Sequence, residues 1–360
     1  YVERMSHEKR ERGTVYKIPV VVHVIHNGEA IGSGANLSAT QINSQIAVLN
    51  KDYRLKNTDS LTTSHAYHPY VADCEIEFCL ATLDPQGHLT TGIDRFNYSM
   101  AMYDYPDLEN TIKPNTIWDA EKYLNIWTCM FGGSISSLLG YTTPPGSPLD
   151  IDGVVISATS FGNTGNVVAP YNKGRTATHE IGHYFNLIHV WGDDGTACTG
   201  SDLVSDTPNQ AGENYGCPTF PSVSCGNGPN GDMFMNYMDY TDDACMKMFT
   251  QGQKTRMRAS LTTGGSRSTL TTSLGCTWPT GLQETAKEWT ITAFPNPTHG
   301  VLYLKAGSDF NTDISFHLFN ALGQEFSNLV TWTKEAGNQY AAHTGSLPDG
   351  NYFLHVSSNG

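Results

Sequence analysis

The chain of 360 residues lacks several features that would place it in particular protein classes. It has no run of eighteen apolar residues, the length that a membrane-spanning helix needs, and its longest apolar stretch, residues 18–25, is as short as a buried strand. Lysine and arginine number only 21 against 35 aspartates and glutamates, and the net charge is −14. Because phosphate binding requires clustered positive charge, no nucleic-acid partner is expected.

The stretch HEIGHYFNLIH, from His179 to His189, has the spacing of a metal site. Histidines four residues apart lie on one face of a helix, so His179 and His183 can reach a single ion. With His189 as a third imidazole, one position of a tetrahedral Zn²⁺ stays open for water, which is typical of catalytic zinc. Glu180 could take a proton from that water. A bare His-Glu-x-x-His also occurs by chance in helices without metal, so the third histidine matters.

Further residues strengthen the metal prediction. The extended histidine motif resembles the metzincin signature, which includes a downstream methionine turn, and Met238 is interpreted as that turn rather than as an ordinary core methionine. Asn186 stands where metzincins usually carry glycine, and asparagine tolerates the positive φ that would swing the chain towards the third histidine. Tyr240 is expected near the metal, where its hydroxyl could stabilise a developing oxyanion.

Eight cysteines are present, four of them between Cys198 and Cys245, and none forms a Cys-x-x-Cys pair. Since histidines already provide a metal site, disulfides in an oxidising compartment are the better explanation. The chain starts at Tyr1 without an apolar leader, so we expect that any signal peptide has been removed. The densely charged residues 1–12 are predicted to be a flexible arm or the remnant of a prosegment.

The first part of the chain predicts an α/β layer. Residues 16–26 are β-branched and almost continuously apolar, as in a strand that is covered on both faces. Ser38 opens a capping box before an amphipathic helix whose apolar side carries Ile42, Ile46, Leu49 and Tyr53. A strand followed by a helix is typical of such layers.

More elements are expected before and within the histidine motif. Strands are predicted over residues 74–80, 122–130 and 152–156. Residues 99–114 show little periodicity and are predicted to be loop. Residues 138–142 are predicted to form an edge strand, on which an extended peptide could add as one more strand. The histidine helix is expected to open at Thr176 or Thr178.

After the third histidine the chain is rich in hard oxygen ligands and lacks regular periodicity. A loop of this length needs something to hold it. We predict Ca²⁺ bound by Asp202, Asp206 and Thr207, with nearby cysteines as staples. A solvated acidic loop without metal would explain these residues equally well.

The length of the chain exceeds what one hydrophobic core usually organises, so more than one domain is expected. A helix over residues 250–270 would close the first domain. The predicted organisation is a catalytic domain over residues 13–276, with an upper part to about residue 186 and a lower part over 187–276, a linker over 277–289, and a domain over 290–360. Short β-like runs between turn signals in the last domain predict a small antiparallel β-sandwich.

Residues 18–250 resemble the pappalysin family of metalloproteases. The resemblance rests on IPVVVHVI, QINSQIAVLNKDYR, HEIGHYFNLIHVWG, SDTP and NYMDYTDDACMKMFT, and the last three motifs are highly specific. It implies a metzincin zinc-protease domain of the α/β (α+β) class, with a mixed sheet and an active-site helix.

Position by position, the resemblance implies zinc ligands His179, His183 and His189, general base and acid Glu180, Met-turn residue Met238 and oxyanion stabiliser Tyr240. It also implies disulfides Cys198–Cys225 and Cys217–Cys245, and structural calcium near residues 202–207. Asp243 matches a position that lines the primed-side specificity pocket. A carboxylate there would favour cleavage before arginine or lysine by charge pairing.

Residues 290–360 resemble the C-terminal sorting domain of the type IX secretion system through FPNPTHG, LFNALGQ and LPDGNYFL. This implies a protein that is secreted by, or displayed on, a Gram-negative bacterium, with the type IX machinery as a partner. Such domains usually finish with a further basic strand, whereas the sequence stops at Gly360.

The sequence thus predicts a secreted zinc endopeptidase that acts on proteins or peptides, with catalytic Zn²⁺ and structural Ca²⁺. The alternative is a surface adhesin or carbohydrate-binding protein with a vestigial zinc site, which rests on fold analogy for the C-terminal domain. The ligands, glutamate, methionine and tyrosine are all intact, and a decayed enzyme would be expected to have lost at least one of them.

Overall fold

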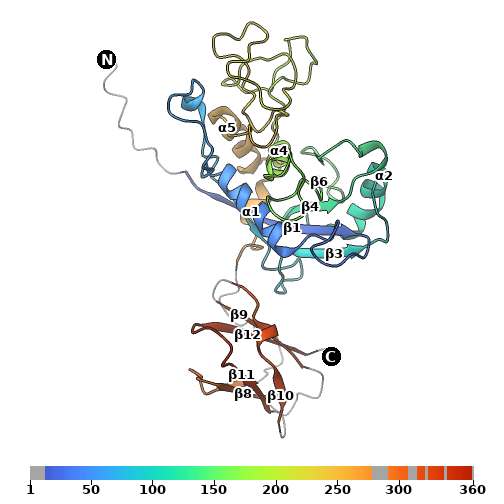
Figure 1. Cartoon of the computed structure of the whole chain (residues 1–360), viewed down its shortest axis with the longest axis vertical. Coiled ribbons are helices and arrows are strands. Elements are labelled where there is room, and N and C mark those ends of the chain that lie inside the picture. Colours follow the sequence, from blue (N-terminus) through green and yellow to red (C-terminus); the bar gives the residue numbers. More distant parts are fainter. Residues whose placement is uncertain (1–12, 278–290, 307–313, 321–322, 336–338, 359–360) are drawn as a thin grey trace, which may run out of the picture. The chain divides into compact units, whose positions relative to one another are not determined.

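A computed structural model describes residues 13–277, 291–306, 314–320, 323–335 and 339–358 (Figure 1). The chain divides into two compact units, residues 1–278 and 279–360. The predicted arm, and the predicted linker apart from residue 277, lie outside the described residues.

A mixed sheet forms the centre of the first unit. Its strands are β1 (Tyr16–His26), β2 (Ile76–Leu80), β3 (Ile93–Asn97), β4 (Leu124–Cys129), β5 (Gly140–Thr142) and β6 (Val154–Ser157). The strand order is β2-β1-β4-β6-β5, and β3 pairs with the second half of β1. All pairs are parallel except β5 with β6, which makes β5 an antiparallel edge strand. The predicted mixed sheet is confirmed, and the predicted edge strand is present over its last three residues.

The helices of the first unit are α1 (Ala39–Asp52), α2 (Tyr105–Asp107), α3 (Lys113–Thr116), α4 (Arg175–Tyr184) and α5 (Gln251–Leu261), with short turns η1 (His68–Tyr70), η3 (Gly133–Ile135) and η4 (Ser268–Thr272). Ser38 caps α1 as predicted, because its hydroxyl accepts the N–H of Gln41 at 3.1 Å. The predicted apolar side of α1 is buried in the same core as the sheet and α4. Figure 1 shows α1 and α4 packed beside each other on the sheet.

The prediction of a loop over residues 99–114 is wrong in its second half. α2, the π-helical turn η2 (Leu108–Ile112) and α3 form one continuous helical segment, residues 105–116. Asp104 opens this segment with a capping box, and Leu108 and Ile112 bury its inner side. Prolines at the first-turn positions of α2 and α3 are compatible with a helix but obscure its signal in the sequence.

Residues 185–250, between α4 and α5, contain no helix and no named strand. Two disulfides close this segment, Cys198–Cys225 and Cys217–Cys245, and both pairings implied by the family resemblance are confirmed. A third disulfide joins Cys79 to Cys276, while Cys74 and Cys129 are free and buried. The closing helix α5 ends at Leu261, earlier than predicted.

The second unit is antiparallel, as predicted. Its strands are β7 (Ile291–Phe294), β8 (Val301–Ala306), β9 (Ile314–Asn320), β10 (Trp332–Lys334), β11 (Gln339–His343) and β12 (Tyr352–Ser358), with turn η5 (Ser327–Leu329). They form one sheet in the order β10-β11-β8-β7 and a second of β12 and β9. Leu318 of β9 and Ala342 of β11 belong to one apolar cluster, so the two sheets share a core. Among the described residues, no helix is long and apolar enough to cross a membrane.

Candidate metal and catalytic site

The histidine helix α4 begins at Arg175, so the prediction that Thr176 or Thr178 opens it is wrong. No side chain at the residue before the helix caps it. Instead, the carboxylate of Asp243 accepts the backbone N–H of Lys173 at 2.6 Å and that of Arg175 at 3.3 Å. Because this cap comes from a residue almost seventy positions away, the local sequence could not reveal where the helix starts.

The chain turns sharply after α4, as predicted. Asn186 has a φ of 72°, and the N–H of Leu187 bonds to the carbonyl of Gly182 at 2.9 Å. Gly182 also lies against fully buried Met238, since a Cβ on this glycine would lie only 2.5 Å from the methionine Sδ. The turn returns the chain to the end of α4 and brings His189 next to the two helical histidines.

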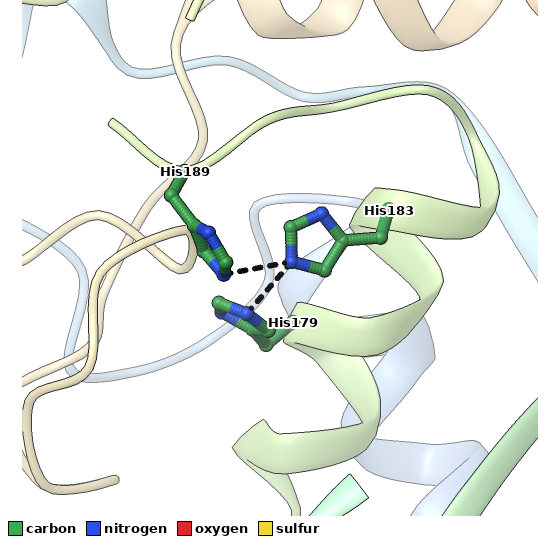
Figure 2. A group of neighbouring side chains, drawn as sticks. All are labelled: His179, His183 and His189. Carbon is green, nitrogen blue, oxygen red and sulfur yellow. Dashed lines mark hydrogen bonds between the residues drawn. The ribbon is translucent and has the colours of Figure 1, made fainter. Parts of the chain in front are cut away.

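Figure 2 shows the imidazoles of His179, His183 and His189 pointing towards one another. Nε2 of His183 lies 3.0 Å from Nε2 of each of the other two. Nitrogens about 2.05 Å from a tetrahedral zinc ion would be about 3.3 Å apart, so the cluster has nearly the spacing of a zinc site. Over the described part of the chain, this is the one group of three or more histidine, cysteine or carboxylate side chains that could hold a metal ion.

Each of the three rings has an oxygen acceptor at Nδ1. These acceptors are the Tyr237 carbonyl at 2.7 Å for His179, the Leu187 carbonyl at 2.9 Å for His183, and the Asp193 carboxylate at 2.6 Å for His189. Nδ1 therefore carries the proton in each ring, and three Nε2 lone pairs converge. Converging lone pairs repel one another unless a cation lies between them, so these residues fit the zinc ion that the motif predicts.

Burial keeps these rings uncharged. It lowers the pKa of His183, and burial together with the other two histidines lowers the pKa of His179 well below its usual value. Burial, followed by the effect of His183, lowers the pKa of His189 to about 3. Neutral imidazole is the form that binds a metal.

Glu180 follows the first histidine directly in α4 and is buried. Burial raises the pKa of its carboxyl group to about 7, and a hydrogen bond with Thr142 acts in the opposite direction. The Thr142 hydroxyl oxygen lies 3.0 Å from Oε2 of Glu180 and 2.7 Å from its backbone carbonyl oxygen. A carboxyl group with a pKa near neutrality can both accept and return a proton, which is the chemistry predicted for this residue.

Aromatic rings surround the histidines. The ring of Tyr240 lies 5.5 Å from that of His179 and 4.9 Å from that of His189, so this tyrosine is close to the cluster as predicted. Trp191 stacks flat on His189, with centroids 4.3 Å apart and planes within 5°. Neither Trp191 nor Asp193 was singled out from the sequence. The signal that could have found them is their position, two and four residues after the third histidine.

The remaining predicted residues are Asp243 and the three predicted calcium ligands. Asp243 is 1% exposed, and burial raises the pKa of its carboxyl group. Its Oδ2 accepts the backbone N–H of Arg175 at the start of α4. Its role in a specificity pocket stays a prediction. Among the predicted calcium ligands, Asp202 and Thr207 bond to each other at 2.8 Å. The Asp206 carboxylate instead accepts the hydroxyl of Thr250 at 2.7 Å and a backbone N–H of α5 at 2.8 Å.

Two family models match the chain. Residues 107–262 match the pregnancy-associated plasma protein-A family, peptidase family M43, and residues 292–360 match the secretion system C-terminal sorting domain. An extracellular metalloprotease of Podospora anserina is 35% identical over 251 residues, which cover 67% of this chain and 72% of that protein. One of Neurospora crassa is 32% identical over 247 residues, 67% of this chain and 73% of that protein.

Among solved structures, mature mirolysin of Tannerella forsythia in complex with a cleaved peptide is similar, with a TM-score of 0.67 and 45% identity over 72% of this chain and 96% of that chain. A promirolysin mutant of the same organism has the same TM-score and identity, and the match covers 85% of that chain. Together with the histidine cluster, these similarities show that the chain belongs to the pappalysin family of metalloproteases and is a secreted metalloendopeptidase with a C-terminal sorting domain.

Proposed function

We propose that the protein is a zinc endopeptidase in which His179, His183 and His189 hold the metal and Glu180 transfers protons. The observation that carries this proposal is the convergence of three Nε2 atoms, each with its Nδ1 proton already bonded to an oxygen. Glu180 follows His179 in α4 with a buried carboxyl group, and its charge acts on Tyr240, whose ring lies next to two of the imidazoles. This combination provides a metal site with an open position and a proton acceptor next to it.

The reaction is a hydrolysis in which water attacks a peptide carbonyl. When bound, Zn²⁺ would acidify water and polarise the carbonyl group. Glu180 accepts the proton of the attacking water and passes it to the leaving amine as the carbon–nitrogen bond breaks. The hydroxyl of Tyr240, whose ring lies next to two of the imidazoles, donates a hydrogen bond to the developing oxyanion. An extended substrate pairs with the free edge of β5, which fixes the position of the scissile bond.

The test is mass-spectrometric mapping of cut sites in a mixed peptide library, with and without phenanthroline. We expect cuts that disappear with the chelator. Glu180→Ala should lose all turnover and retain zinc, whereas Glu121→Ala, at an exposed glutamate of the same unit, should match the wild type. Substantial turnover by Glu180→Ala would show that another group transfers the proton.

We also propose that the enzyme prefers arginine or lysine directly after the cut, through charge pairing with Asp243. In support, this carboxylate is buried next to the start of α4, one turn before the first predicted ligand. Among the described residues no ion pair includes Asp243, and the nearby guanidinium of Arg175 pairs with Asp52 and Asp59. A buried carboxylate discriminates strongly in favour of a cationic side chain.

Asp243→Asn is the sharpest variant for this preference. The amide oxygen can still accept the two N–H groups at the start of α4, so the helix keeps its cap while the charge is lost. Cuts before arginine and lysine should fall relative to all other cuts in the same library, with an unchanged melting temperature. An unaltered preference would place the selectivity elsewhere.

A structural calcium ion is proposed near residues 202–207, with Asp202, Asp206 and Thr207 as ligands. In the surrounding loop, two buried acceptors, Oδ1 of Asp194 and Oε1 of Gln210, lack a hydrogen-bond partner among the described residues. Unpaired buried oxygens are costly unless a cation satisfies them. A calcium-selective chelator should lower the melting temperature while zinc remains bound, and an identical melting curve would contradict the proposal.

Export by the type IX system of a Gram-negative bacterium is proposed from the match of residues 292–360 to the sorting-domain model. The working boundaries are a catalytic domain over residues 13–276 and a sorting domain over 290–360. In a host that has this system, a carrier protein fused to residues 290–360 should reach the medium or cell surface. Retention of the fusion inside the cell would count against this route.

A further inference from the structure

Strand β5 has two faces with different partners. Gly140 and Thr142, two residues apart, face α4: a Cβ on Gly140 would lie 2.9 Å from Cγ of Glu180, and the Thr142 hydroxyl reaches the same residue. Tyr141 points the other way, and its hydroxyl donates to Glu109 at 2.7 Å. This alternation is that of an ordinary strand, so the side of β5 that faces the helix is occupied by the side chain of Glu180.

The Thr142 hydroxyl is the one hydrogen-bond partner of the Glu180 carboxylate within the described chain. The Thr142 hydroxyl oxygen lies 2.7 Å from the backbone carbonyl oxygen of Glu180 and 3.0 Å from its Oε2. Both contacts keep the hydroxyl next to this glutamate, whichever oxygen accepts its proton. Gly140, which lies against Cγ of Glu180, has no side chain that could add a second polar contact. A glutamate side chain otherwise has three rotatable torsions.

We propose that Thr142 is a positioning residue: its hydroxyl holds the Glu180 carboxylate in the orientation needed for proton transfer. The inference rests on the proposed function, in which Glu180 is the proton acceptor. It adds that the edge strand expected to pair with substrate also sets the geometry of the general base. One strand would then align both the scissile bond and the group that acts on the attacking water.

Contacts of a buried ion pair on the other face of β5 hold the strand, and with it Thr142, in position. Lys113 is fully buried, and its Nζ lies 2.6 Å from Oε1 of Glu109, 3.2 Å from Oγ1 of Thr143 and 4.9 Å from the ring centroid of Tyr141. This ion pair therefore contacts the two residues on either side of Thr142 in sequence. A strand anchored in this way cannot slide along its neighbour β6 without breaking buried polar contacts, which is costly.

The decisive variant is Thr142→Val, which keeps the shape of the side chain and removes the hydroxyl. We expect kcat to fall about 10- to 100-fold with KM within about twofold of the wild type, because a misplaced catalytic group slows chemistry more than binding. Thr142→Ser should recover most of the loss. Thr128→Val is the control: it removes the hydroxyl of a fully buried strand threonine that has no hydrogen-bond partner in the described chain, and it should leave kcat unchanged.

Two further measurements separate positioning from a merely structural role. The zinc content of Thr142→Val should equal that of the wild type and of Thr142→Ser, so that metal loss cannot explain the fall in kcat. Crystal structures should show that the Glu180 carboxylate has left its place in Thr142→Val and has kept it in Thr142→Ser. An unchanged kcat, or equal losses in Thr142→Val and Thr142→Ser, would overturn the proposal.

The crystal structures also keep the two proposals apart. A wild-type protein that cleaves no peptide would contradict the proposed function, whereas the position of the carboxylate in the two variants would still decide what Thr142 does. A wild type that cleaves, together with an unmoved carboxylate in Thr142→Val, would overturn only the role of Thr142.

Discussion

The two halves of the candidate site are held by different means. The sheet part, residues 13–184, contributes two histidines and Glu180 from a helix that packs on a mixed sheet. The loop part, residues 185–250, contributes the third histidine, Met238 and Tyr240 without any helix or named strand. Apolar packing positions the first group. The second group shares that core through Leu187, Val190 and Met238, and disulfides and polar contacts hold the rest of its segment. Both achieve the same convergence, so regular secondary structure is not required for it.

In the loop part, aspartate carboxylates accept hydrogen bonds from groups of the kind that strand pairing satisfies in the sheet part. The carboxylate of Asp239 accepts hydrogen bonds from Gln210, from both nitrogens of Asn214 and from the backbone of Tyr240. The carboxylates of other aspartates in this part, among them Asp194 and Asp232, also accept several hydrogen bonds each. Asp194 and Asp239 accept backbone N–H groups that have no strand partner, as buried irregular backbone requires, and Asp232 accepts side-chain donors.

Arg175 joins the two parts, and its removal is expected to have the largest effect on stability. Its guanidinium pairs with Asp52 and Asp59 of the sheet part and donates to the carbonyls of Asp243 and Met246 of the loop part. Arg175→Ala leaves the buried Asp52 carboxylate without its ion pair and should cost about 3–5 kcal/mol in the free energy of unfolding.

Chemical denaturation measures this cost. The control is Arg54→Ala, which removes a more exposed ion pair within the sheet part and should cost about 1 kcal/mol or less. Equal costs for the two variants would mean that Arg175 does not join the two parts.

Removal of a disulfide should affect the two parts unequally. Replacing Cys217 and Cys245 by alanine opens a bridge with a sequence separation of 28 and should cost about 2–4 kcal/mol. Hydrogen exchange should rise over residues 185–250, while β1 keeps its protection because its core is unchanged. A uniform rise in both parts would show that they unfold as one unit.

Replacing Asp193 tests whether the loop part also sets the zinc affinity of the metal site. Its φ of 55° favours glycine or asparagine as replacements without backbone strain. Asp193→Gly removes the acceptor for His189 and should weaken zinc binding about 10- to 100-fold. Asp193→Asn keeps a neutral acceptor and should fall between this variant and the wild type. Competition with a zinc-chelating dye gives the affinities, and equal values for all three proteins would refute the role.

The smallest effect is expected at the junction of the loop part and α5. Thr250 caps this helix through Gln253, and it also donates to Asp206. Thr250→Ala should cost about 1 kcal/mol, measured by thermal unfolding. Thr255→Ala, on the exposed side of the same helix, removes a hydroxyl that bonds only within the helix and should cost less. The reverse order would mean that the cap contributes little.

The sequence revealed the parts of the site that local patterns encode. Histidine spacing, the tolerance of Asn186 for positive φ and the capping motif at Ser38 each depend on neighbouring residues, and all agree with the structure. The start of α4 was missed because its cap comes from Asp243. Strand β3 was missed because none of its residues is buried, so it lacks an apolar alternation. The contact of Thr142 with Glu180 depends on strand pairing, which no short stretch of sequence specifies.

The bond between Cys79 and Cys276 has a mechanical consequence. It fastens the last described residues of the first unit to β2, next to the bonds of Thr82 with Gly275 and Thr277. A pull on the chain from the side of the C-terminal domain would therefore be borne by a covalent link into the central sheet. Helix α5 and the three histidines lie within the loop that this disulfide closes, so the bond relieves them of part of that load.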